Sequence, residues 1–109
     1  SGEDWGIGGP GKPRIPGRQG VGFPECVYCP TPTYSEEARK AKYQGTVTLR
    51  VVVLPDGRAT NISVVRGLGM GLDERAVEAV RGWQFKPALG PRGEPLPVVL
   101  LIEVTFRLF

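Results

Sequence analysis

Residues 95–109, the last stretch of the chain, read PLPVVLLIEVTFRLF. From residue 98 onward every second position is apolar, and the positions between include Glu103, Thr105 and Arg107. A period of two places alternate side chains on opposite faces of a β-strand. The stretch therefore predicts one long strand, whereas strands in globular proteins usually have about five or six residues. Because proteins normally protect a strand edge from pairing with other chains, the question is what covers this edge.

Glycine and proline divide the chain into two parts. The 109 residues include 16 Gly and 11 Pro, and these crowd residues 1–32, where apolar residues are too scattered to build a core. We expect residues 1–32 to be a Gly/Pro-rich arm or linker, loosely attached, and residues 33–109 to be the folded domain. A unit of this size can bury about 60% of its unfolded surface, enough for a single marginal core without a cofactor.

The charge pattern argues against a nucleic-acid partner, and the hydropathy argues against a membrane-spanning helix. The net charge is +3, but basic residues are interleaved with acidic ones in SEEARKAK (35–42) and LDERAVEAVR (72–81), which is typical of a solvated face. Nucleic-acid binding would need clustered Lys and Arg, so we expect no nucleic-acid partner. The longest apolar runs, LRVVVL and LPVVLLI, are far shorter than the roughly 20 residues that a membrane-spanning helix needs.

The residues before the final strand predict two helices and a hairpin. TYSEEARKAKYQG (33–45) is typical of a short helix that is capped by Ser35 and ends at Gly45. TVTLRVVV (46–53) and RATNISVVR (58–66) predict two strands joined by an Asp-Gly turn, with a bulge near residues 60–61 in the second. LDERAVEAVRGWQF (72–85) switches to helical spacing, with Leu72, Ala76, Val80 and Trp83 on one stripe.

This order of elements indicates an α+β fold. We expect a three-stranded antiparallel sheet, built as β-β-α-β after a preceding short helix, with helices packed on one face. The final strand cannot insert between two strands that a tight turn joins. It therefore lies at an edge of the sheet, where a further strand can pair with it.

Four pieces of the chain, in this order and spacing, resemble the C-terminal domain of TonB-type energy transducers. They are PTYSEEARKAKYQGTV, VLPDGRATNISVV, LDERAVEAVRGWQFKPA and the alternating final strand. The resemblance covers residues 31–109. It departs from the family at Tyr34-Ser35, where Tyr-Pro is frequent, and in a spacer that is Gly-rich and lacks long Pro-Lys or Pro-Glu repeats.

The resemblance implies a periplasmic binding module that is not an enzyme. In such proteins an inner-membrane helix, absent from this chain, couples the domain to a proton-channel partner complex. The domain binds the N-terminal box peptide of outer-membrane receptors, which adds as a strand beside the final strand. Onto this sequence the resemblance carries a partner-binding role for Pro97, Val99, Leu101, Glu103, Thr105 and Arg107, and for Cys29, Thr31 and Thr33 in the stretch before Tyr34.

Cys26 and Cys29 form the motif CVYC. A C-x-x-C pair can be a redox dithiol, half of a zinc site or a local disulfide. The chain has no His and no further Cys, so a monomer cannot complete a Cys/His zinc site, and we expect no metal and no cofactor. A disulfide suits an oxidising compartment, while free thiols and a thiol-disulfide enzyme remain alternatives.

The other polar and aromatic motifs have structural interpretations. Trp83 and Phe85 bracket the end of the second helix, and because Trp83 continues its buried stripe we expect both to pack in the core. Trp5 either docks on the domain or is exposed. The acidic residues in the first turns of that helix are Asp73, Glu74 and Glu78. They are typical of interactions with the helix dipole and of surface ion pairs. GIGGPG (6–11) lacks the preceding strand and the following Gly-Lys-Ser/Thr of a phosphate-binding loop.

Two further functions remain open at this stage. The final strands of two copies can pair with each other to form a homodimer. Alternatively, the same domain can serve as an interaction module fused to a membrane sensor or peptidase.

Overall fold

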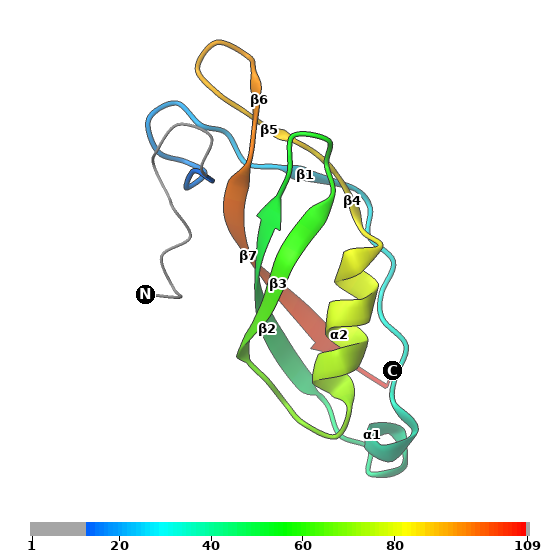
Figure 1. Cartoon of the computed structure of the whole chain (residues 1–109). Helices are drawn as coiled ribbons and strands as arrows, with labels where there is room; N and C mark the ends of the chain where they lie inside the picture. The colour runs from blue at the N-terminus through cyan, green and yellow to red at the C-terminus, as the bar shows by residue number, and fades with distance from the viewer. Residues whose placement is uncertain (1–12, 109) are drawn as a thin grey trace.

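The computed structural model describes residues 13–108. Trp5 and the GIGGPG motif lie outside these residues. Figure 1 shows two helices and a central sheet, with short strands at one end of it. The elements are β1 (Glu25–Tyr28), α1 (Glu36–Lys40), β2 (Gly45–Val53), β3 (Ala59–Arg66), α2 (Leu72–Arg81), β4 (Gln84–Lys86), β5 (Ala88–Leu89), β6 (Pro95–Leu96) and β7 (Val98–Phe106).

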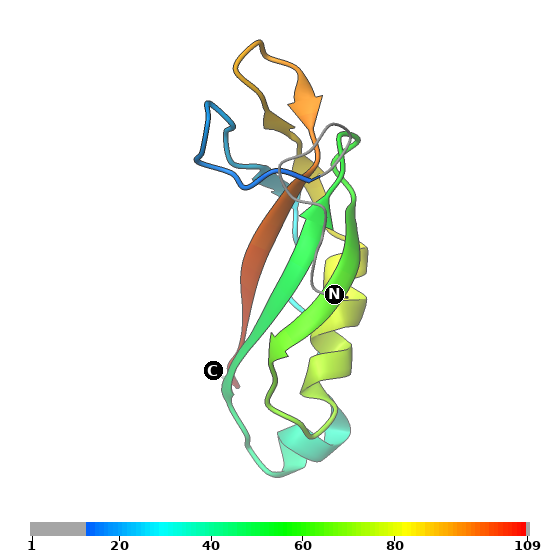
Figure 2. The same cartoon turned by 60° about the vertical axis from the view of Figure 1, so that its left-hand side comes forward.

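The central sheet has the order β3-β2-β7, and both pairings are antiparallel. β2 and β7 pair without a register shift from Gly45 opposite Phe106 to Val53 opposite Val98. In Figure 2 the sheet is seen more from its edge, and α2 covers one of its faces. The predicted α+β fold is confirmed, and β7 lies at the edge of the central sheet as expected.

The core lies between α2 and the face of the sheet formed by alternate residues of β2 and β7. α2 contributes Leu72, Ala76 and Val80, all fully buried, as the helical spacing of the sequence predicts. The helix ends at Arg81, so the helical prediction is wrong for the last residues of 72–85, where β4 begins at Gln84. Phe85 is buried too, while Trp83 is half-buried and packs against the core from its margin. The sheet residues of the core are Val47, Leu49, Val51, Val53, Val98, Ile102, Val104 and Phe106.

The short helix α1 begins as predicted but ends earlier. The Ser35 hydroxyl accepts a hydrogen bond from the N–H of Ala38 at 3.2 Å, which confirms the predicted cap. The helix ends at Lys40, and Lys42 takes a left-handed conformation with φ 54°. The prediction that Gly45 ends the helix is wrong. Gly45 begins β2, where a Cβ would lie 2.7 Å from Leu68 Cδ2, so packing explains this glycine.

The hairpin of β2 and β3 is closed by the Asp-Gly turn. The Asp56 carboxylate accepts hydrogen bonds from Arg58, from its main-chain N–H at 3.0 Å and its Nε at 2.7 Å. These bonds lower the pKa of Asp56. The register shifts between Ser63 and Thr60, and Asn61 has a φ of 49°, which confirms the predicted bulge.

The segment between α2 and β7 contains short strands that the periodicity of the sequence does not predict. Residues 86–97 include the small hairpin of β5 and β6, and β4 precedes it. Glu94 stabilises the tip of this hairpin by accepting the N–H of Arg92 at 2.9 Å. The four prolines and two glycines of residues 86–97 are typical of a loop, so they gave no sign of these short strands. Strands this short are determined by the strands they pair with rather than by their own periodicity.

The described part of the arm, residues 13–32, packs on the domain, unlike the loose attachment that its composition predicts. Val21 is 3% exposed and belongs to the core, and the N–H of Gly22 donates to Leu89 O at 2.9 Å. β1 pairs with β4, with Cys26 opposite Phe85. A few long-range contacts hold this segment, and composition does not reveal them. The domain boundary at residue 33 stays a prediction.

Substitution of Gly57 tests how closely the hairpin turn approaches β4. A Cβ at Gly57, which has φ +89°, would lie 2.0 Å from Phe85 O, whereas Gly93 has φ +80° and nothing within 4 Å of its Cβ position. We expect Gly93→Ala to lower the free energy of unfolding by about 1–2 kcal/mol, the cost of the left-handed conformation. Gly57→Ala should cost at least about 1 kcal/mol more, because the backbone of Phe85 must move.

Urea denaturation followed by Trp fluorescence measures both losses. Equal losses in the two variants would contradict the close approach of Gly57 to Phe85.

Candidate functional site

β7 presents one edge of its main chain to β2 and the other edge outward. Successive residues of a strand direct their N–H and C=O groups to opposite edges. The N–H of Val99 donates outward, to Arg14 O at 2.9 Å, rather than to β2. The even-numbered residues from 98 to 106 therefore bond to β2. The outward groups belong to Val99, Leu101, Glu103 and Thr105, which are four of the predicted partner-binding residues.

The side chains of these residues lie on the face of the sheet opposite the core. Leu101 is 60% exposed, an unusual position for a large apolar side chain. Glu103 and Thr105 are exposed as well, and Thr105 Oγ1 lies 3.3 Å from Thr46 Oγ1 on β2. Within residues 13–108, the outward N–H groups of Leu101, Glu103 and Thr105 have no main-chain partner. We call this stretch, Leu101 to Thr105, the open edge.

The arm occupies the beginning of the same edge. Arg14 forms a parallel bridge opposite Val98. Its N–H donates to Pro97 O at 2.8 Å and its C=O accepts from Val99 N–H. Pro97, a predicted contact residue, is thus already bonded to the arm through its carbonyl group. Arg14 is the residue of this site that the sequence analysis missed.

A hollow of about 340 Å³ lies at the other end of the open edge. Its walls come from the segment before α1 and from the end of β7. Tyr34 is held there by two contacts: its ring packs edge-on against Phe106 at 5.5 Å, and its hydroxyl donates to Tyr43 O at 2.7 Å. The structure thus brings two predicted regions together. The lining residues are Thr31, Pro32, Tyr34, Thr105, Phe106 and Arg107.

Two predicted contact residues lie away from the hollow. Thr33 is exposed but does not line it. Cys29 lies beside β4, with its Sγ 4.0 Å from Gln84 O. Between residues 29 and 34 the chain runs from a position beside β4 to a position beside the end of β7. Only the later residues of this segment therefore reach β7.

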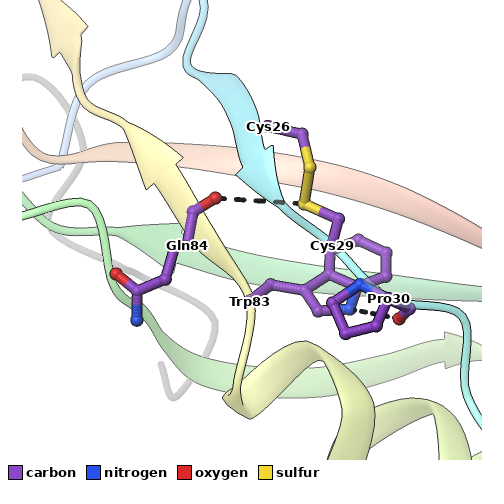
Figure 3. The surroundings of a disulfide bond; sticks show 5 residues. All are labelled: Cys26, Cys29, Pro30, Trp83 and Gln84. Atoms are coloured by element: carbon purple, nitrogen blue, oxygen red, sulfur yellow. Dashed lines mark hydrogen bonds between the residues drawn. A yellow bond between two sulfur atoms is a disulfide. The ribbon is translucent and has the colours of Figure 1, made fainter.

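Cys26 and Cys29 are joined by a disulfide, one of the states that the sequence left open for this pair. Figure 3 shows it beside the segment that carries Pro30, above the ring of Trp83. The indole Nε1 of Trp83 donates to Pro30 O at 2.9 Å. The disulfide links Cys26 of β1 to the residue before Pro30, and the Trp83 indole ties Pro30 to the end of α2. Together they position the wall of the hollow.

The described residues contain no metal site and no membrane helix. In residues 13–108 no three His, Cys, Asp or Glu side chains gather to hold an ion. In the same range neither helix has the length and apolarity to cross a bilayer. Asp73, one of the acidic residues of α2, accepts the N–H of Leu68 at 2.7 Å and so fixes the loop before the helix.

The comparison with protein families assigns the chain. A family model described as the Gram-negative bacterial TonB protein C-terminal matches residues 30–108. The chain belongs to the TonB C-terminal family. The four sequence pieces that resemble this family all lie within or at the border of the matched range.

Relatives of this TonB C-terminal domain are much longer proteins. The chain is 41% identical over 63 residues to the protein tonB2 of Pseudomonas aeruginosa strain PAO1 and 30% identical over 74 residues to the protein TonB of Escherichia coli K12. The matches cover 57% and 67% of this chain, but only 23% and 30% of those proteins.

A solved structure shares the fold. The solution NMR structure of the Pseudomonas aeruginosa TonB CTD superposes with a TM-score of 0.63 at 20% identity, covering 78% of this chain and 86% of that one.

Removing the disulfide should loosen the segment that it closes without unfolding the core. A loop of this length, between positions separated by three, stabilises by about 2 kcal/mol in the chain-entropy model. We expect the double variant Cys26→Ser, Cys29→Ser to lose at most about that much stability. The signal of the Trp83 indole N–H should shift in NMR spectra. Reducing the unchanged protein is the control, and loss of the whole fold in either case would contradict this account.

Proposed function

We propose that this TonB C-terminal domain binds an extended peptide as an additional strand on the open edge of β7. The guest is the N-terminal box peptide of outer-membrane TonB-dependent receptors. The domain then works in the periplasm, anchored by an inner-membrane segment upstream. A proton-channel partner complex in that membrane supplies energy, which the domain passes to the receptor. Family membership supports the setting, and the open edge supports the mode of binding.

One observation carries this proposal. The outward main-chain groups from Val99 O to Thr105 form a continuous row without partners in residues 13–108, beside a fully paired ladder with β2. Natural proteins normally cover or blunt such an edge. Here Glu103 is the only charged residue among these positions, and Leu101 is a large exposed apolar side chain. Peptides that add to a sheet edge gain affinity from main-chain bonds and specificity from alternate side chains.

The magnitudes favour a transient complex. Roughly five main-chain hydrogen bonds at about 0.5–1.5 kcal/mol net each give about 2.5–7.5 kcal/mol. Association costs at least about 4 kcal/mol, so main-chain pairing alone binds weakly. Contacts with Leu101 and in the hollow beside Tyr34 can add the remainder. A weak complex suits a link that must be released after each transport step.

The geometry also suits the transmission of force. A guest strand beside β7 is pulled along the strand direction, so its hydrogen bonds are loaded together in shear rather than one after another. β7 itself is held by the uninterrupted ladder with β2. The load therefore passes from the guest into the strand pair with the longest ladder among the described elements.

A proline in the open edge tests the binding mode. The N–H of Glu103 points outward, so Glu103→Pro removes a donor for the guest and leaves the ladder with β2 intact. Against box peptides from receptors of the same organism, we expect Glu103→Pro to weaken binding about tenfold or more, through a lost bond and a steric block. Glu103→Ala, which keeps the N–H, is the matched control. Calorimetric or NMR titration gives the affinities.

Equal affinities of the two variants would show that the guest does not pair at this edge. Sedimentation of the unchanged protein tests the homodimer. If two copies pair through β7, Glu103→Pro abolishes the dimer and peptide binding stays undetectable in all variants.

A further inference from the structure

The arm and β7 form the beginning of a strand pair that then stops. Arg14 uses both of its main-chain groups on the outer edge of β7, with the N–H on Pro97 O and the C=O on Val99 N–H. In a parallel pair the next bond would run from the N–H of residue 16 to Val99 O. Residue 16 is proline, which has no N–H. The pairing therefore cannot continue along β7.

The fold also directs the chain away from β7 after this bridge. The chain turns at Pro16 and Gly17, and Gly17 has a φ of +87°. The N–H of Gly17 donates to Val21 O at 2.7 Å, and the buried Val21 ties this turn to the core. The loop of residues 17–21, anchored in the core by Val21, thus holds Arg14 in place on β7. The Arg14 bridge occupies one position of the outer edge and leaves the rest of that edge open.

We infer that residues 13–16 act as an end stop that sets the register of the guest strand on β7. The inference rests on the proposed function. A guest that pairs through main-chain bonds alone can slide along an edge in steps of two residues, since every second residue offers the same groups. With Arg14 on Val99, the guest meets the end stop at one end and the hollow beside Tyr34 at the other. It is confined to the outward groups between Val99 O and Thr105.

The end stop is a main-chain device, and this determines how it can be removed. Arg14→Pro places a ring carbon where the N–H of Arg14 points. The 2.8 Å between Arg14 N and Pro97 O leaves no room for that carbon, so the segment must leave the edge. Arg14→Ala removes the charge and the long side chain but keeps both main-chain groups. The two variants separate the main-chain bridge from any effect of the guanidinium group.

Amide hydrogen exchange of the whole chain, measured by NMR without any peptide, tests the bridge itself. In the unchanged protein and in Arg14→Ala we expect the Val99 amide to be protected, and those of Leu101, Glu103 and Thr105 to exchange rapidly. In Arg14→Pro the Val99 amide should exchange about tenfold faster or more. Unchanged protection of Ile102 and Val104, which bond to β2, shows that the fold is intact. A Val99 amide that exchanges equally in all three proteins overturns the inference.

The register is tested with a receptor box peptide that carries a nitroxide at one end. On the unchanged protein and on Arg14→Ala, we expect one pattern of paramagnetic broadening along β7 and no change in the protection of the Val99 amide when the peptide binds. On Arg14→Pro, a second pattern shifted by two residues should appear, and Val99 should become protected by the peptide. A single identical pattern on all three proteins overturns the end stop alone. Failure of the peptide to bind any of them overturns the proposed function, and the guest register with it.

Discussion

The structure depends on the ladder between β2 and β7. It runs without a bulge from Gly45 opposite Phe106 to Val53 opposite Val98. In a strand, the face on which a side chain lies and the edge to which its main-chain groups point alternate together. Once Ile102 and Val104 face the core beneath α2, the main-chain groups of Leu101, Glu103 and Thr105 must point away from β2. A slip of one residue would exchange the two sets and bury Glu103.

The N-terminal segment gives the open edge its two ends. Arg14 closes the beginning of the edge through main-chain bonds, and Thr31 to Tyr34 form the wall of the hollow at the other end. Between these points the segment is attached by Val21 in the core, by β1 on β4, and by the Trp83 bond to Pro30. The residues that composition marks as an arm therefore take part in shaping the site.

Much of the central architecture was predictable from local patterns. The alternation in residues 98–106 and the helical spacing of Leu72, Ala76 and Val80 each arise from burial of one face, so they appear directly in the order of residues. The Asp-Gly turn and the Ser35 cap depend on the residue types at single positions, so they too can be recognised in the sequence. The early end of α1 was not visible, because Lys42 takes a conformation that usually favours glycine, while Gly45 is required by its contact with Leu68.

The sequence by itself determined that the final strand lies at an edge of the sheet and which of its side chains face the core, because periodicity separates the two faces and a tight hairpin turn excludes insertion between its strands. It also marked residues 29–33 as a second contact region through the family resemblance. Only the tertiary structure decided how far the edge is open. The bridge from Arg14 and the bond between Trp83 and Pro30 join residues more than fifty positions apart. The Arg14 bridge uses main-chain groups on both sides, and the Trp83 indole donates to a main-chain carbonyl, so no local pattern of side chains identifies the partner in either contact.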